Sequence, residues 1–280
     1  MTVVRTLADL RAALAEPRRR TEIGFVPTMG ALHQGHTTLV AAARTECGHT
    51  VASIFVNPTQ FNDPADLAAY PRQAADDERL AAAAGVDTLF LPDVAEVFPA
   101  DHATRLVVGG AARGLEGDYR PGHFDGVALV CLKLFLMTQP ARVYFGQKDA
   151  QQVAVIQQMV RDLDVPVVLR VVPTVRDPDG LALSSRNVQL SREARACALA
   201  LPRALRAGLE AHRRGADPRP PALAALNVSS SVDVEYVEVA PFEAGPTLVI
   251  AARVGTTRLI DNVPLDRPEL AGLRPAVPCP

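Results

Sequence analysis

The chain has 280 residues, of which 48% are hydrophobic and 21% charged, and its formal net charge at pH 7 is −2. Such values are typical of a folded protein with a full core, in one large domain or two ordinary ones. Basic and acidic residues are mixed along the chain, which argues against a nucleic-acid partner.

The cysteines and the apolar segments further limit the class of protein. Cys47, Cys131, Cys197 and Cys279 form no C-x-x-C pair, so neither a zinc site nor a disulfide framework is indicated. Scattered thiols and an early charged N-terminal segment are typical of a cytoplasmic protein without a signal peptide. The longest apolar run, 126–138, contains a lysine and is too short to span a bilayer, so we expect no membrane association.

The first part of the chain alternates between two hydrophobic patterns. Short apolar runs predict strands at 22–28, 51–56, 87–91, 105–108, 142–145 and 167–172. Longer amphipathic runs predict helices at 35–46, 71–84, 126–138 and 149–163. Strands that alternate with helices predict an α/β fold with a Rossmann-like, doubly wound parallel sheet.

The pattern changes near residue 175. A helix is predicted at 191–214, and the segment HRRGADPRPP should end it. Strands are predicted at 232–239, 247–253 and 256–260, and the Pro-rich tail from residue 265 is expected to fray. We therefore expect two domains, 1–174 and 175–280, the second a smaller α+β domain.

Polar segments follow four of the predicted strands. They are MGALHQGH after 22–28, NPTQFND after 51–56, GQKDAQQ after 142–145 and PTVRDPDGLALSSRN after 167–172. Open parallel sheets bind ligands beyond the carboxyl ends of their strands. We therefore predict that the four segments converge on one crevice.

His33 and His36 stand three residues apart where a helix is predicted to begin. A helix N-terminus attracts phosphate, and imidazoles there can donate to phosphate oxygens. Gly30 and Gly35 would let the backbone approach a nucleotide closely. The alternatives are a turn with two surface histidines and a metal site, but the latter lacks an intervening Glu and an obvious third ligand.

Each of the other polar groups also has a structural alternative. Lys148 and Asp149 can be charges at the start of a helix, with Asp149 as its cap. The letters SSRN can simply open a helix or a loop, and Asp76 and Asp77 can lie on a solvated helix face. Only the joint pattern favours a functional site.

The motifs resemble a known family. HQGH is similar to the H-x-G-H signature of the nucleotidyltransferase superfamily that includes class I aminoacyl-tRNA synthetases, and LALSSRN resembles its Ser-rich basic loop. In one order, PTMGALHQGH, IFVNPTQF, YPR, YRPGHFDGV, VYFGQKDAQQ and DGLALSSRN resemble the pantothenate synthetases, which are pantoate–beta-alanine ligases of coenzyme A biosynthesis. The resemblance covers residues 20–262.

The resemblance implies a reaction in two steps. ATP would activate (R)-pantoate as pantoyl adenylate with release of pyrophosphate, and beta-alanine would then displace AMP to give pantothenate. It also implies ATP as a substrate, Mg²⁺, a homodimer and a C-terminal domain that acts as a lid. The apolar segments at 51–56 and 105–108 are weak candidates for the dimer surface.

The resemblance also implies roles for particular residues. The catalytic residues would be His36, His33 and Lys148. The ATP site would comprise Met29, Gly30, Ala31, Leu32, His33, Gln34, Gly35, His36, Gly146, Gln147, Lys148, Asp149, Val175, Leu183, Ser184, Ser185 and Arg186. Pantoate and beta-alanine would meet Gln60 and Gln152, with Asn57, Tyr70, Arg120 and His123 as wall residues. Asp76 and Asp77 would lie near the metal.

Three positions depart from or vary within the family pattern. Ala150 stands where an aromatic residue often follows KD, and Gln147 stands where Glu is common. Leu183 occupies a position held by Met or Leu. No charged group of the pattern is lost, so we expect an active enzyme in which the ATP affinity could be altered.

Other functions remain open. A different H-x-G-H nucleotidyltransferase would keep the histidines and the Ser-Ser-Arg loop but would not need Gln60 and Gln152. A tRNA synthetase would need an anticodon-binding domain and a basic surface. A nucleotide-binding regulatory module usually loses one of the groups His33, His36 and Lys148, which are all present here.

Overall fold

A computed structural model of the chain describes residues 1–228, 230–243 and 245–273. Cys279 and the end of the Pro-rich tail lie outside these residues. The chain folds into two compact units. The first comprises Met1–Phe145 and Gln151–Val172, and the second comprises Gly146–Ala150 and the chain from Pro173 onward.

The first unit is built on a six-stranded sheet in the order β1-β4-β3-β2-β5-β6. The strands are β1 (Thr2–Val4), β2 (Ile23–Thr28), β3 (His49–Ile54), β4 (Thr88–Phe90), β5 (Arg142–Gly146) and β6 (Val168–Val172). The pairings β1–β4, β4–β3, β3–β2 and β2–β5 are parallel. The predicted parallel α/β sheet is therefore confirmed.

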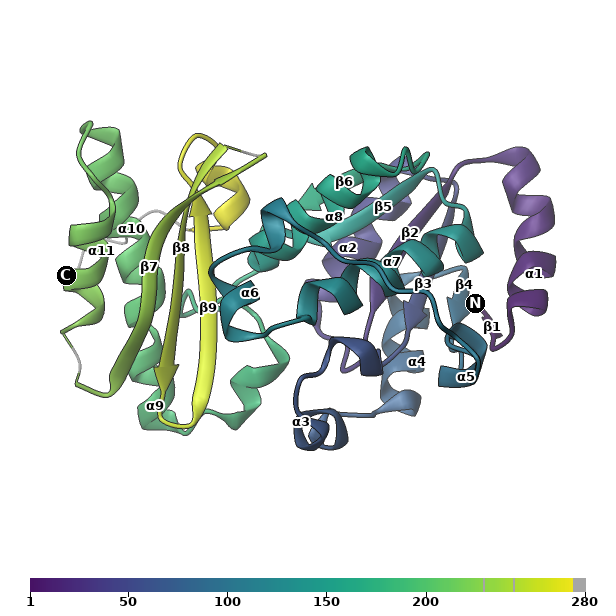
Figure 1. Ribbon diagram of the computed structural model, residues 1–280, viewed down its shortest axis with the longest axis horizontal. Coiled ribbons are helices and arrows are strands. Elements are labelled where there is room, and N and C mark those ends of the chain that lie inside the picture. The colour runs from purple at the N-terminus through teal and green to yellow at the C-terminus, as the bar shows by residue number, and fades with distance from the viewer. Residues whose placement is uncertain (229, 244, 274–280) are drawn as a thin grey trace. The chain divides into compact units, whose positions relative to one another are not determined.

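Helices cover the sheet on both faces (Figure 1). The helices of this unit are α1 (Leu7–Arg20), α2 (Gln34–Glu46), α3 (Pro64–Ala69), α4 (Ala74–Ala84), α5 (Val94–Val97), α6 (Glu116–Tyr119), α7 (His123–Thr138) and α8 (Ala150–Asp162). Phe25 packs in the core formed with α1, α7 and α8, whereas its neighbour Val26 packs in the core formed with α2 and α4. Both faces of β2 are thus buried, which explains its continuous apolar sequence.

Two predictions in the first unit are wrong. Residues 105–108 form no strand; the peptide N–H of Val108 donates instead to the Asp125 carboxylate at 2.8 Å. The helix predicted at 71–84 begins only at Ala74. The sequence patterns also did not reveal β1 and α1, because β1 has three residues and α1 carries Pro17 within its last turn.

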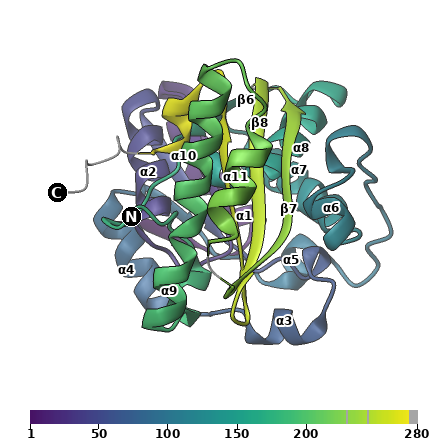
Figure 2. The same cartoon turned by 90° about the vertical axis from the view of Figure 1, so that its left-hand side faces the viewer.

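The second unit contains an antiparallel sheet of three strands, β7 (Val232–Phe242), β8 (Gly245–Val254) and β9 (Thr257–Pro264). Figure 2 shows α10 (Ala200–Arg213) and α11 (Arg219–Leu226) lying over one face of this sheet. Leu205, Leu226 and Ile250 are fully buried between the helices and the strands. The three predicted strands are confirmed.

The predicted helix 191–214 is instead two helices, α9 (Arg192–Ala198) and α10, separated at Leu199. Pro202 explains the break, because it has no N–H to donate to the carbonyl of Ala198. The start of the tail does not fray as predicted: a short 3₁₀ turn, η5 (Pro268–Ala271), buries Leu270 and Ala271.

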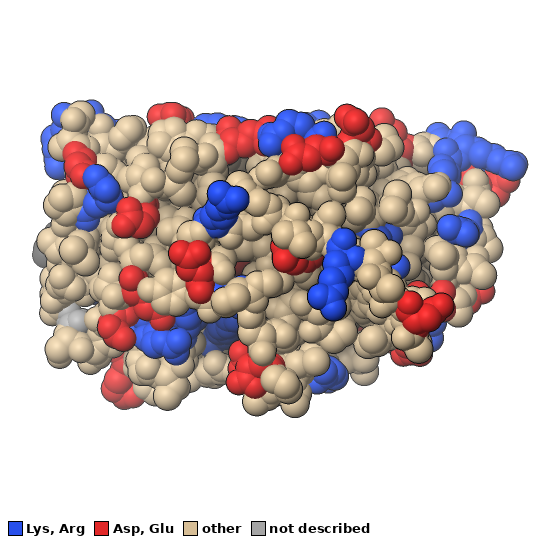
Figure 3. All heavy atoms as spheres, viewed as in Figure 1, with Lys and Arg blue, Asp and Glu red and all other residues tan. Residues whose placement is uncertain are grey.

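No helix in the described part of the chain combines the length and apolar character that a bilayer crossing requires. On the face drawn in Figure 3, basic and acidic side chains are interspersed.

Candidate active site

The turn after β2 carries the first polar motif. Thr28 donates from Oγ1 to the carbonyl of Ser53 on β3 at 2.7 Å and accepts from the N–H of Gly30 at 3.2 Å. Gly30 and Ala31 have left-handed backbones, with φ of 86° and 49°. Such a backbone is strained at a residue with a side chain, so other contacts must hold Ala31 in place.

Asp77 supplies those contacts. Its carboxylate, on α4, accepts from the N–H of Ala31 at 2.9 Å and from the N–H of Leu32 at 2.7 Å. The residue is only 2% exposed. A Cβ at Gly30 would lie 2.9 Å from Asp77 Oδ2, so the close approach itself requires glycine. Asp77 thus holds the turn that leads into α2.

The side chains of His33 and His36 cap the start of α2 by accepting from peptide N–H groups. His33 Nδ1 accepts from the N–H of Gly35 at 3.0 Å, and His36 Nδ1 accepts from the N–H of His33 at 3.2 Å. The two rings lie 4.2 Å apart between centroids. Because each Nδ1 is an acceptor, the neutral rings carry their proton on Nε2. A Cβ at Gly35 would come within 2.7 Å of the His33 ring, which explains this glycine.

The two aspartates on α4 are both engaged by other groups of the protein. Both carboxylate oxygens of Asp77 are engaged by peptide N–H groups, while exposed Asp76 forms an ion pair with Arg79. Among the described residues, no group of three His, Cys, Asp or Glu side chains is placed to hold a metal. The metal role of Asp76 and Asp77 stays a prediction.

A second cluster forms around the 3₁₀ turn η1 (Pro58–Gln60), which follows β3. Buried Asn57 donates from Nδ2 to Gln60 Oε1 at 2.9 Å and to the carbonyl of Gly126 at 3.1 Å. His123 at the start of α7 contacts the Gln60 carbonyl through Nδ1 at 2.9 Å, and its Nε2 lies 3.3 Å from an Arg120 nitrogen. The structure thus brings four of the predicted substrate residues together.

The remaining predicted substrate residues lie on nearby elements of the first unit. Tyr70 ends α3, and its ring lies 5.7 Å from that of Phe61 between centroids. Gln152 is half-buried on α8.

Sequence reasoning missed the role of the preceding glutamine. Buried Gln151 donates from Nε2 to the carbonyls of Ala111 and Gly114, both at 3.1 Å, and accepts from the N–H of Glu116 at 2.9 Å. It fixes the loop before α6. Because these partners are about 40 positions away in the chain, no local pattern could have revealed them.

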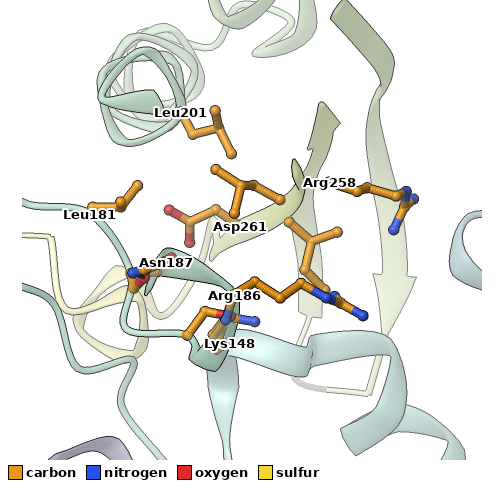
Figure 4. A pocket seen from close by; sticks show the side chains of 11 residues that line it. Lys148, Leu181, Arg186, Asn187, Leu201, Arg258 and Asp261 are labelled. Carbon is orange, nitrogen blue, oxygen red and sulfur yellow. Dashed lines mark hydrogen bonds between the residues drawn. The ribbon is translucent and has the colours of Figure 1, made fainter. Parts of the chain in front are cut away.

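In the second unit, Lys148, Ser184 and Arg186 line one hollow, together with Arg258 of β9 (Figure 4). The Lys148 ammonium lies 3.2 Å from Asp149 Oδ1, and the Lys148 side chain is only 19% exposed. Three cations thus border the hollow, but Lys148 and Arg258 are each paired with a carboxylate, and Asp261 lines the same hollow. Arg258, which pairs with Glu235 at 2.6 Å, was not predicted.

The Ser-Ser-Arg segment is shaped locally. Leu183 donates its N–H to the carbonyl of Val175 at 2.9 Å, and Ser184 caps the 3₁₀ turn η4 (Ser185–Gln189) by accepting from the N–H of Arg186 at 3.2 Å. Ser185 begins that turn.

The turn at 177–181 that precedes this segment is held by Arg195 of α9. Its guanidinium lies 2.5 Å from an oxygen of Asp177 and 2.8 Å from one of Asp179. Burial of Asp179 raises its pKa, but hydrogen bonds from Arg195 and the N–H of Leu181 outweigh that effect and leave the pKa below its usual value. The Asp179 carboxylate therefore stays ionised near neutral pH and keeps its pairing with Arg195.

The convergence of the four polar segments on one crevice stays a prediction. His33, His36, Asn57 and Gln60 belong to the first unit, whereas the segment Gly146–Ala150 and the Ser-Ser-Arg segment belong to the second.

The parallel sheet, with helices on both faces and polar turns at the carboxyl ends of β2 and β3, defines a Rossmann-like α/β protein. A family model described as Pantoate-beta-alanine ligase matches residues 2–264. The chain belongs to this family, as its motifs predicted.

Relatives and solved structures agree with this assignment. The chain is 50% identical over 276 residues to pantothenate synthetase from Chloroflexus aggregans, covering 94% of this chain and 99% of the relative. It is 47% identical over 277 residues to that from Cereibacter sphaeroides, with 94% and 99% covered.

Two crystal structures are similar along nearly the whole chain. Pantothenate synthetase from Thermus thermophilus has a TM-score of 0.89 at 46% identity, covering 95% of this chain and 99% of that one. Pantoate-beta-alanine ligase from Francisella tularensis, complexed with beta-gamma ATP and beta-alanine, has a TM-score of 0.81 at 34% identity, with 95% and 98% covered.

Proposed function

We propose that this chain condenses (R)-pantoate with beta-alanine to form pantothenate, using ATP and passing through pantoyl adenylate. The family match across residues 2–264 carries this proposal. The groups that the chemistry needs are all present: two imidazoles at a helix N-terminus, a lysine, a Ser-Ser-Arg segment and paired amides.

In the first step, a pantoate carboxylate oxygen attacks the α-phosphorus of ATP, and the bond to the bridging oxygen of pyrophosphate breaks. The Nε2–H groups of His33 and His36, at the positive end of α2, would donate to phosphate oxygens as charge moves onto the leaving group. The capping contacts of both Nδ1 atoms support this role, because they fix the ring orientation and the tautomer before substrate arrives.

The second unit would neutralise the rest of the triphosphate. Lys148 offers a point charge, and Ser184, Ser185 and Arg186 offer two hydroxyls and a planar guanidinium. The hollow shared by Lys148, Ser184 and Arg186 supports this assignment. The rest of the predicted ATP site would supply backbone and wall contacts. It comprises Met29, Gly30, Ala31, Leu32, Gln34, Gly35, Gly146, Gln147, Asp149, Val175 and Leu183.

Pantoate would lie against the amides of Gln60 and Gln152. Because Asn57 donates to Gln60 Oε1, the Nε2 of Gln60 is the end that can donate to a pantoate oxygen. A neutral amide orients a carboxylate without adding a buried charge. Tyr70, Arg120 and His123 would complete the wall.

In the second step, the beta-alanine amine attacks the acyl carbon of the adenylate. The acyl–oxygen bond to AMP breaks, AMP leaves with that electron pair, and the amine gives up a proton. Water must be excluded while the adenylate waits, since water would hydrolyse it. We assign this shielding to the second unit, which would act as a lid over the ATP and pantoate sites of the first.

Mg²⁺ would enter as part of the substrate, bound to phosphate oxygens of ATP. The two carboxylates of Asp76 and Asp77 are otherwise engaged, which supports a metal carried by the nucleotide. We further propose that the enzyme works as a homodimer in the cytoplasm, and light scattering over a range of protein concentrations tests the dimer.

The deciding experiment is ATP–pyrophosphate exchange measured with and without pantoate, in the absence of beta-alanine. We expect exchange that requires pantoate, followed by pantothenate and AMP formation when beta-alanine is added. Exchange that ignores pantoate would favour a different nucleotidyltransferase. Binding of ATP with no exchange under any condition would favour a regulatory module. The Lys148→Ala variant serves as the matched low-activity control.

A further inference from the structure

Asn262 of β9 makes three hydrogen bonds to the lysine loop, which we define as Gly146–Ala150. Its Oδ1 accepts from Gln147 Nε2 at 2.9 Å, and its Nδ2 donates to the carbonyl of Gln147 at 3.0 Å and to that of Lys148 at 2.8 Å. Asn262 and Gln147 are both 2% exposed. Both N–H groups and the oxygen of the Asn262 amide are thus engaged, so its orientation is fixed.

The residue before Asn262 anchors a second segment. Asp261 accepts from two nitrogens of Arg176 at 2.7 and 2.9 Å, and the side chains of this pair are each 2% exposed. Arg176 also donates to the carbonyl of Gly180, at the turn just before the Ser-Ser-Arg segment. A buried bidentate pair of this kind holds its partners in one geometry.

Consecutive residues of one strand therefore hold two segments that line one hollow. Asn262 holds the lysine loop, and Asp261 holds the segment that leads to Ser184 and Arg186. Because β9 is paired along its whole length with β8, neither anchor can shift alone.

We propose that Asn262 is a positioning residue for adenylate formation, which acts by fixing Lys148 relative to Ser184 and Arg186. This inference rests on the proposed function, since it assigns Lys148 to the phosphates of ATP. Asn262 bonds to the backbone of Lys148, so it sets the place of the ammonium without taking part in the chemistry. The side chain of Gln147 is then a partner of Asn262 rather than a direct ligand.

The test is a double-mutant cycle with Asn262→Ala and Lys148→Ala, read by pantoate-dependent ATP–pyrophosphate exchange and by ATP affinity in titration calorimetry. Asn262→Ala alone should lower the exchange rate about 10- to 100-fold, because small displacements of catalytic groups have such effects. The KM for pantoate should stay within about twofold, as expected for a residue that does not touch pantoate.

The cycle distinguishes positioning from general damage. If Asn262 acts through Lys148, the double variant should match Lys148→Ala, so the two effects are not additive. Should Lys148→Ala be too slow for exchange, ATP affinity supplies the same comparison. Additive effects would overturn the proposal. A parent chain without pantoate-dependent exchange would instead refute the proposed function.

Leu226→Ala controls for loss of stability. Leu226 is fully buried in the core of the second unit and lies on α11, away from the lysine loop. The Leu226→Ala variant should have a lower melting temperature. Below its melting transition, its exchange rate should stay close to that of the parent. Both variants are assayed at the same interval below their own melting temperatures. If Leu226→Ala then slows exchange as much as Asn262→Ala, the positioning role of Asn262 is wrong.

Discussion

At the scale of single residues, the Asp77 carboxylate accepts two hydrogen bonds from consecutive peptide N–H groups. These bonds stabilise the left-handed backbone at Gly30 and Ala31. The carboxylate thus uses its acceptors on the turn itself, and we infer that its role is to hold the turn rather than to bind a metal.

We therefore expect Asp77→Asn to lower exchange tenfold or more and to destabilise the first unit by about 1–3 kcal/mol, because an amide NH₂ would face a peptide N–H. The Mg²⁺ concentration that gives half-maximal exchange should not change. Asp76→Asn, at an exposed ion pair, should stay near the parent in both respects. A large rise in the Mg²⁺ requirement of Asp77→Asn alone would restore the metal role.

His36 combines a cap with a proposed phosphate contact. Removal of a cap typically destabilises by about 1 kcal/mol, whereas loss of a donor to a developing charge lowers turnover roughly 10²–10³-fold. His36→Ala should therefore melt only a few degrees below the parent but lose most of its exchange activity. If thermal melting shows a collapse in stability that accounts for the lost activity, His36 is a structural residue only.

At the scale of elements, side chains of α8 hold the loop that precedes α6, and Gln158 accepts there from the N–H of Ala111 at 2.9 Å. Gln151 contacts the carbonyls of Ala111 and Gly114 and the N–H of Glu116. Arg113, between these contacts, is exposed and is a site for trypsin.

Gln151→Ala should accelerate trypsin cleavage after Arg113 about tenfold or more, because local opening becomes easier when several buried hydrogen bonds are lost. Mass spectrometry of a time course measures the cleavage rate. Gln157→Ala, on the same helix, is the control and should cleave like the parent. Equal cleavage in the Gln151 variant would show that other contacts hold the loop.

The elements also show where sequence reasoning succeeds. Strands such as β2 and β3 were predictable because burial on both faces makes their central residues mostly apolar. The segment 105–108 has a similar apolar composition, but its Val108 finds a partner in Asp125 rather than in a neighbouring strand. A local pattern cannot tell these cases apart, since the difference lies in a contact 17 positions away.

The candidate site also combines residues that local sequence predicts with residues whose contacts are distant in the chain. The motif residues at strand ends could be named from the sequence, because their chemistry and spacing are local. Asp77, Gln151 and Asn262 act through groups that lie 35 to 115 positions away, so only the fold reveals these contacts. The resemblance had already named Asp77, but for a metal role.

At the scale of the whole molecule, pH dependence of stability involves His49 at the start of β3. Burial lowers its pKa below the ordinary value of 6.5, although the Asp87 charge partly opposes this. Its ring contacts Thr88 Oγ1 at 3.0 Å. The unfolded chain therefore binds a proton at this residue more readily than the folded chain does, so its contribution to stability is lost as pH falls below about 6.5.

We expect the melting temperature of the parent to fall faster between pH 7 and pH 5 than that of His49→Asn, whose side chain does not titrate there. The difference between the two curves isolates His49 from the carboxylates, which both proteins share. Parallel curves would show that His49 is protonated as readily in the folded chain as in the unfolded one.

The lysine loop affects whether the second unit can be expressed as a separate fragment. The chain leaves the first unit after Phe145, contributes five residues to the second and returns at Gln151. A fragment beginning at Pro173 would therefore lack the groups that Asn262 binds, and its buried amide would lose all three partners. Independent expression of the C-terminal piece should give an aggregating or partly folded product, and a peptide of sequence GQKDA joined through a short linker is the addition most suited to rescue it.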